Sequence, residues 1–119
     1  MKTLMILNDP PYGTERTYNG LRLALSLLQK AEDRDLELTV FLMGDAVASA
    51  KVGQQTPAGY YNLERMLKGV VTRTGRVLLC GSCMDARALR EEEVVEGCRR
   101  SSLDELTEAT LCSDRVLVF

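Results

Sequence analysis

Two cysteines separated by two residues are the part of this sequence best suited to chemistry. Cys80 and Cys83 frame the segment Cys-Gly-Ser-Cys, directly after the apolar run at residues 76–79. A thiolate attacks disulfides and accepts sulfane sulfur as a persulfide, so the pair suits sulfur transfer or reversible disulfide formation. The chain contains no histidine, which excludes histidine-based acid–base catalysis and histidine metal ligands. Sulfur is therefore the first place to look for function.

Three interpretations of the pair are open at this point. The first is a reactive thiol on Cys80 that works with Cys83. The second is a zinc site completed by Cys98 and Cys112, but the spacing C-x2-C-x14-C-x13-C lacks a second close pair. The third is a pair of small side chains that pack in the core without a chemical role. The position behind a strand favours the first interpretation.

Two charged residues follow the pair and would change the thiolate population in opposite directions. Arg87 adds a positive charge that favours a thiolate, whereas Asp85 opposes it. A free cysteine with a pKa of about 8.5 is only a few per cent ionised at pH 7. Backbone N–H groups at the start of a following helix would stabilise the charged form. Cys80, Cys83 and Arg87 are therefore the candidate catalytic residues, and the two opposite charges leave the net shift of the thiol pKa open.

The other two cysteines receive no chemical role. Cys112 ends an apolar stripe that includes Leu106 and Ala109, which predicts a place in the core. Cys98 precedes Arg99 in a polar stretch, which predicts an exposed position.

The elements that must position these residues are strands that alternate with helices. Short apolar runs predict strands at Lys2–Leu7, Glu37–Leu42, 76–79 and 115–119. Helical spacing and capping residues predict helices at 14–32, 45–50, 63–74 and 103–111, with Asn62 and Ser102 as N-caps and Gly75 as a stop. The segment 89–100 predicts no definite element.

This alternation predicts an α/β fold with parallel strands, because parallel neighbours need long crossover connections. Right-handed crossovers place the strand-to-helix loops on one rim of the sheet. The loops that meet there are 8–13, 44–60 and 80–87. The candidate substrate-binding residues on these loops are Asn8, Tyr12, Gly13, Asp45 and Asp85.

The composition describes one ordinary domain spanning residues 1–119. Hydrophobic residues make up 45% of the 119, and the net charge is −2 without a basic block, so nucleic acid is not an expected partner. The first apolar run is too short for a signal peptide or a membrane span. We expect a cytoplasmic protein, where thiols stay reduced and four cysteines do not predict two structural disulfides.

Several separated stretches, in this order, carry a resemblance to a known family. They are LNDPPYG at 7–13, NGLRLA at 19–24, VFLMGDAV at 40–47, GQ at 53–54 with GYYN at 59–62, CGSCMDAR at 80–87 and DRVLVF at 114–119. In these motifs the chain resembles the DsrE/DsrF-like family, and above all its YchN-like members.

The resemblance implies a three-layer α/β sandwich with a mostly parallel central sheet of about five strands, assembled as trimers or hexamers. It also implies a link to intracellular sulfur relay, in which Cys80 corresponds to the persulfide-carrying cysteine. Cys83 matches the second cysteine of YchN-like members, and Arg87 matches the family's arginine. A glycine usually follows that arginine, and here Ala88 stands in its place.

These expectations combine into one functional hypothesis with two alternatives. The leading hypothesis is a cytoplasmic sulfur carrier, sulfurtransferase-like, that takes sulfur from a donor protein and passes it to an acceptor protein through a persulfide on Cys80. It needs neither a cofactor nor a metal. The alternatives are a thiol–disulfide redox protein that uses the same pair, and a non-catalytic oligomeric binding module.

Overall fold

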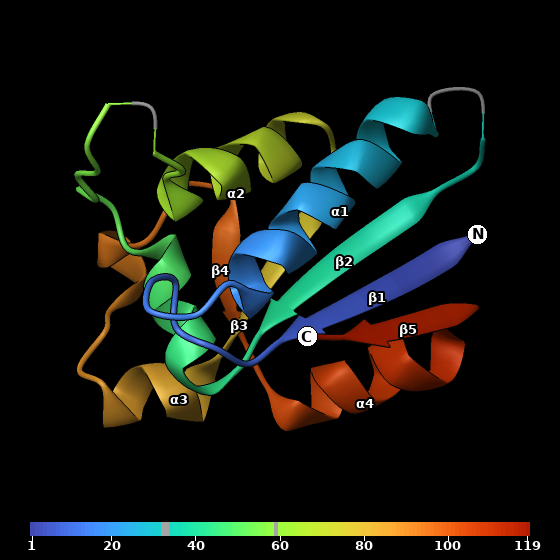
Figure 1. The fold of residues 1–119 in the computed structure, drawn as a ribbon. Helices are drawn as coiled ribbons and strands as arrows, with labels where there is room; N and C mark the ends of the chain where they lie inside the picture. The colour runs from blue at the N-terminus through green and yellow to red at the C-terminus, as the bar shows by residue number, and fades with distance from the viewer. Residues whose placement is uncertain (32–33, 59) are drawn as a thin grey trace.

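The chain is organised by a five-stranded sheet in which every neighbouring pair of strands is parallel (Figure 1). The computed structural model describes residues 1–31, 34–58 and 60–119. The strands are β1 (Lys2–Leu7), β2 (Glu37–Leu42), β3 (Arg76–Cys80), β4 (Cys98–Ser101) and β5 (Arg115–Val118), in the spatial order β4-β3-β2-β1-β5. The predicted α/β fold with a parallel sheet is confirmed.

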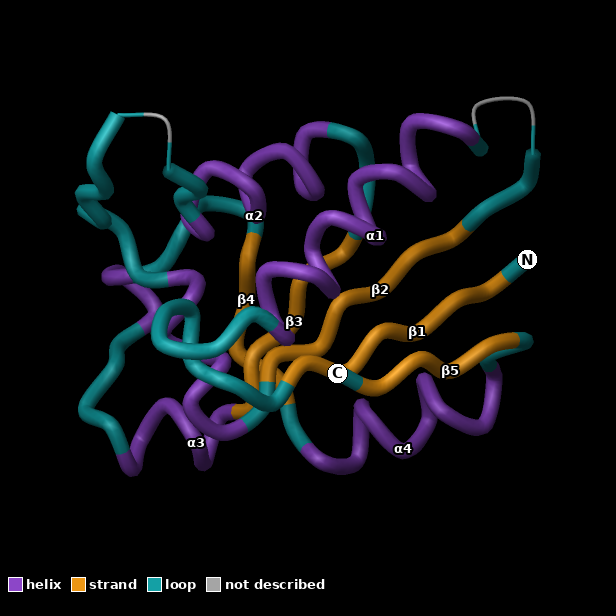
Figure 2. Tube along the Cα trace, in the orientation of Figure 1, coloured by secondary structure: helices purple, strands orange, loops and turns teal. Residues whose placement is uncertain are grey.

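Helices cover both faces of this sheet. Helices α1 (Arg16–Lys30) and α2 (Leu63–Thr72) lie together on one face, and α4 (Leu103–Cys112) lies on the other (Figures 1 and 2). Helix α3 (Gly81–Ala86) continues directly from β3. The 3-10 turns are η1 (Gly44–Ala50) and η2 (Glu91–Glu93). No helix in the described ranges is long and apolar enough to cross a membrane.

The three central strands are apolar because helices cover both of their faces, as is usual in parallel sheets. Strands β1 and β2 pair in register from Lys2 with Glu37 to Leu7 with Leu42. Phe41 in β2 is only 1% exposed and is the largest fully buried side chain of the described residues. The apolar runs of the sequence therefore correspond to the strands that form the core.

Strand β4 is the element that the sequence does not predict. Its residues Cys-Arg-Arg-Ser show no apolar run, because an edge strand pairs on one side only and can expose charged side chains. It pairs with β3 from Val77 with Cys98 to Cys80 with Ser101. This register places Ser101 beside the first cysteine of the pair.

The structure reverses both predictions for the remaining cysteines. Cys98 is buried, 8% exposed, because it faces inward from β4. Cys112 is exposed, since α4 buries only Leu106 and turns the end of its predicted apolar stripe toward solvent. Both predictions are therefore wrong. The buried face of α4 is therefore narrower than the number of apolar residues in the helix indicates.

The sequence predicts Gly75 as the residue that stops helix α2. In the structure, Thr74 adopts the left-handed conformation that terminates this helix. Thr74 adopts a left-handed φ of 67°, and its N–H donates to the Val71 carbonyl at 3.0 Å. The N–H of Gly75 donates to the Val70 carbonyl at 2.9 Å. This is the bond pattern of a Schellman cap. Gly75 is required for space, because a Cβ there would lie 2.5 Å from Cγ1 of Val70.

Candidate functional site

The carboxyl end of β3 is the centre of the candidate site. Cys80 is the last residue of β3 and also the N-cap of α3. Contacts between the predicted rim loops join this region. Arg87 Nη2 lies 2.8 Å from Asp45 Oδ1, and the Tyr12 hydroxyl donates to Gln54 Oε1 at 2.6 Å. The loops that follow β1, β2 and β3 therefore meet on one rim.

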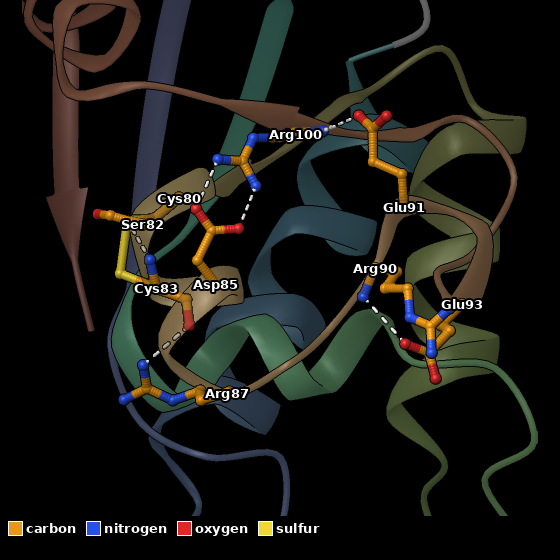
Figure 3. A network of polar contacts seen from close by, with 9 residues as sticks. All are labelled: Cys80, Ser82, Cys83, Asp85, Arg87, Arg90, Glu91, Glu93 and Arg100. Carbon is orange, nitrogen blue, oxygen red and sulfur yellow. Dashed lines mark hydrogen bonds and ion pairs between the residues drawn. A yellow bond between two sulfur atoms is a disulfide. The ribbon is translucent and has the colours of Figure 1, made fainter.

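Cys80 and Cys83 form a disulfide in this structure, and their Cα atoms are 5.2 Å apart (Figure 3). The backbone N–H of Cys83 donates to Cys80 Sγ at 3.3 Å. The hydroxyl oxygen of Ser82 lies 3.4 Å from the same sulfur. Two polar groups thus contact Cys80 Sγ, and both would stabilise negative charge on it after reduction.

The two cysteines differ in exposure. Cys80 is buried, 8% exposed, whereas Cys83 is half-buried. Bulky reagents in solution therefore reach Cys83 more readily. Reagents that react at Cys80 need a path through the cavity beside it.

A cavity of about 390 Å³ provides that path. Its lining is mainly apolar, with a few hydroxyl groups and one guanidinium. The lining residues are Phe41, Met43, Cys80, Gly81, Ser82, Cys83, Arg100, Ser101, Ser102 and Leu103. Leu103, the first residue of α4, is 68% exposed. The cavity therefore leaves room for a small group beside the Cys80 sulfur.

The predicted catalytic Arg87 lies at the other end of α3. Its Nε donates to Asp45 Oδ1 at 2.9 Å. Its Nη1 donates to the carbonyl oxygen of Cys83 at 3.0 Å, as Figure 3 shows. Its hydrogen bonds therefore fix the end of α3 against η1. Any effect of this charge on the sulfur of Cys80 acts from a distance.

The charge of Asp85 is balanced by a partner that the sequence does not indicate. Arg100 donates to both carboxylate oxygens of Asp85, at 2.7 and 2.8 Å. These hydrogen bonds lower the pKa of Asp85 below its ordinary value. The carboxylate that was expected to oppose the thiolate is thus held in a neutral ion pair.

The candidate residues of the first loop make contacts within the fold. Asn8 Nδ2 donates to the carbonyl oxygen of Phe119 at 3.0 Å. The Tyr12 hydroxyl also accepts from the N–H of Leu63 at 3.2 Å, and Gly13 turns the chain with a φ of 99°. These three residues shape the rim. They are not among the described residues that line the 390 Å³ cavity.

Sequence reasoning missed the residues that surround Cys80 in space. Phe41 and Met43 come from β2 and the residue after it, and Arg100 comes from the unpredicted β4. Gly81 had one available signal, because a glycine next to a strand often marks a close approach of another backbone or side chain. A Cβ there would lie 2.8 Å from the Ser101 carbonyl oxygen and 2.9 Å from Arg100 Cζ.

Cysteine and acidic side chains do not gather into a metal site in the ranges that the structure describes. Cys98 is buried in β4, and Cys112 is exposed on α4. The chemistry that the arrangement supports is that of two neighbouring sulfur atoms.

The turn that follows helix α3 contains a residue whose conformation suits glycine. Ala88 has a φ of 52°, in the left-handed region. Its N–H donates to the Asp85 carbonyl at 3.1 Å, and the N–H of Leu89 donates to the Met84 carbonyl at 3.0 Å. This is a second Schellman cap without glycine. The turn thus keeps the geometry that a glycine would favour.

Replacing Ala88 with glycine is therefore expected to stabilise the protein by about 1 kcal/mol. The left-handed conformation costs an L-residue roughly 1–2 kcal/mol, and glycine avoids this cost. Part of the gain is lost again, because glycine gives up more chain entropy on folding. Thr74→Gly at the matching position of α2 should act in the same direction. Urea unfolding measures both changes, and a loss of stability in both variants would contradict this explanation.

The chain matches the model of the DsrE/DsrF-like family over residues 1–119. Protein YchN of Escherichia coli strain K12 is 36% identical over 118 residues, which cover 99% of this chain and 98% of YchN. The uncharacterized protein MJ0989 of Methanocaldococcus jannaschii is 34% identical over 119 residues, and the match covers 100% of both chains.

Solved structures agree with this match. The crystal structure of the YchN protein from E. coli superposes with a TM-score of 0.90 at 36% identity, covering 99% of this chain and 98% of that one. The protein of unknown function MTH1491 from Methanobacterium thermoautotrophicum gives a TM-score of 0.75 at 9% identity over the same shares, which shows the fold alone. On the family match and its YchN relative, this chain belongs to the DsrE/DsrF-like family.

Proposed function

We propose that this protein is a small cytoplasmic sulfur carrier that holds a persulfide on Cys80. The observation that carries the proposal is the position of Cys80 Sγ, which lines the 390 Å³ cavity and contacts the Cys83 N–H at 3.3 Å. A persulfide is partly anionic and needs both a space for its outer sulfur and donors for its charge. The cavity and the N–H supply these two requirements.

The reaction begins from the reduced pair. The Cys80 thiolate attacks the outer sulfur of a donor persulfide, and the donor leaves as a thiolate, so one sulfur atom moves without net oxidation. Attack by an acceptor thiolate on the outer sulfur of the Cys80 persulfide returns Cys80 to its thiolate. The donor and acceptor are other thiol compounds or proteins. A reducing compartment such as the cytoplasm is what keeps the pair ready for this cycle.

A second candidate function is thiol–disulfide exchange, which the Cys80–Cys83 disulfide favours. Here the Cys83 thiolate attacks the inner sulfur of a persulfide, or of a mixed disulfide, on Cys80. The leaving group is hydrosulfide or a thiolate, and the pair becomes a disulfide. Each turnover then requires a two-electron reductant such as a dithiol.

Intact mass measurement after exposure to a persulfide donor tests the proposal. The reduced protein is incubated with glutathione persulfide, and its mass is followed over time. We expect a species that is one sulfur atom heavier in the wild type and its loss in Cys80→Ser. We also expect a longer-lived persulfide in Cys83→Ser, because the neighbouring thiol is gone.

Cys112→Ser is the matched control, because it removes an exposed cysteine outside the cavity. A persulfide that persists in Cys80→Ser but disappears in Cys112→Ser would overturn the assignment to Cys80. Direct conversion of the wild type to the disulfide, without a heavier species, would favour the redox function. The trimer or hexamer implied by the family resemblance stays a prediction.

A further inference from the structure

Arg100 connects edge strand β4 to the helix that carries Cys83. Its side chain crosses Gly81, where a Cβ would lie 2.9 Å from both Cζ and Nε. Its two terminal nitrogens then donate to the two carboxylate oxygens of Asp85 (Figure 3). The contact is therefore a bidentate ion pair laid over the backbone of the Cys-Gly-Ser-Cys segment.

The main chain of Arg100 is itself held in place. It pairs with Leu79 in the β3–β4 register, and its N–H donates to Glu91 Oε1 at 3.1 Å. The guanidinium thus reaches α3 from a fixed strand. A bidentate arginine–carboxylate pair also fixes orientation better than a single hydrogen bond does.

Helix α3 needs such external contacts, because it has only six residues. A helix of this length is not stable alone, so its neighbours decide where it lies. The buried Met84 anchors one side of α3, and Arg87 joins the Cys83 carbonyl to η1. The Arg100–Asp85 pair is the contact that ties α3 to the sheet edge beside Cys80.

We propose that Arg100 and Asp85 are positioning residues that set the reduction potential of the Cys80–Cys83 pair. They hold α3 where the Cys83 sulfur remains within bonding reach of Cys80 after reduction. Without them, α3 moves more freely in the dithiol form and must be ordered again when the disulfide closes. Loss of the pair therefore shifts the equilibrium toward the dithiol and makes the disulfide more oxidising.

The equilibrium concerned is the exchange of one protein dithiol with oxidised glutathione, which gives the protein disulfide and two molecules of reduced glutathione. Asp85 and Arg100 are partly exposed, with side-chain exposures of 64% and 43%, so the effect is moderate. We expect about a fivefold fall in the equilibrium constant, which is about 20 mV for this two-electron couple. This inference rests on the disulfide and not on sulfur carriage.

The test compares four variants with the wild type in glutathione buffers, with alkylation to trap the thiols and intact mass to count them. Arg100→Met, Asp85→Asn and the double variant should each show the same fivefold shift, because either single change breaks the pair. Arg99→Met is the matched control. It removes the neighbouring arginine, whose ion pair goes to Glu105 at 2.6 Å, and should leave the potential unchanged.

Three results from the variants would overturn the proposal, and a fourth would come from the wild type. The first is an unchanged potential in Asp85→Asn and Arg100→Met, and the second is an equal shift in Arg99→Met. The third is a double variant that shifts about 25-fold, the product of two independent effects. A wild type that forms no Cys80–Cys83 disulfide overturns it together with the redox function. Failure of the persulfide experiment alone leaves the measured shifts intact, so the two failures are distinguishable.

Discussion

Phe41→Ala is expected to lower the free energy of unfolding by about 3–5 kcal/mol, the range for removing a fully buried aromatic ring. Phe41 is 1% exposed in the central strand β2, and the loss combines its apolar burial with the hole left behind. Urea unfolding followed by circular dichroism measures the change. Phe41→Leu is the control and should lose less, because it keeps most of the volume.

The same substitution should also change access to the thiols. Phe41 lines the cavity beside Cys80, so its removal enlarges the path to the sulfur. We expect the reduced Phe41→Ala protein to be alkylated faster at Cys80 than the wild type under conditions where both are folded. A stability loss of less than about 1 kcal/mol together with unchanged alkylation would contradict both the burial of this ring and its place in the cavity lining.

The second large effect is a loss of stability at alkaline pH that originates at Cys98. Burial disfavours its thiolate and raises the pKa of Cys98 from the ordinary 9.0 to about 12. Between these two values the unfolded chain releases a proton that the folded chain keeps. The free energy of unfolding therefore falls as pH rises through this window. The stability that the protonated Cys98 contributes is fully present only below the window.

Each unit of pH in this window is worth about 1.4 kcal/mol, so the wild type should lose about 2 kcal/mol by a pH of about 10.5. Urea unfolding at several pH values measures the slope. Cys98→Ala should give a flatter pH profile, whatever its stability at neutral pH. Cys112→Ser is the control, because it removes an exposed cysteine and leaves the buried one in place. Parallel profiles for the wild type and Cys98→Ala would contradict this assignment.

Local sequence signals predicted the elements that depend on local chemistry. Asn62 caps α2 by accepting from the Arg65 N–H at 3.1 Å, and Ser102 caps α4 by accepting from the Glu105 N–H at 3.2 Å. Cys80 lies at the end of its strand, as the apolar run indicated. Capping and strand ends are decided within a few residues, so one sequence suffices to find them.

Contacts that depend on strand pairing could not be predicted in the same way. Asp85 and Arg100 are 15 residues apart, and they meet only because β4 pairs with β3. Arg87 and Asp45 are 42 residues apart and meet through the β2–β3 neighbourhood. The burial of Cys98 likewise follows from the unpredicted edge strand. The contacts around the site could therefore be found only once the strand order was known, whereas the thiol pair could be found from the sequence alone.

The order of the strands also means that one helix, α4, connects the two edge strands of the sheet. Strands β4 and β5 are consecutive in the chain but lie at opposite edges, and α4 makes the connection beneath the sheet. The same helix begins at Leu103, which forms part of the wall around Cys80. Local unfolding that detaches α4 would remove part of the wall beside Cys80 and uncover the face of the sheet near β5, while β5 itself stays paired with β1. Access to the thiols therefore depends on how firmly α4 packs against the sheet, since local openings differ in free energy across a fold.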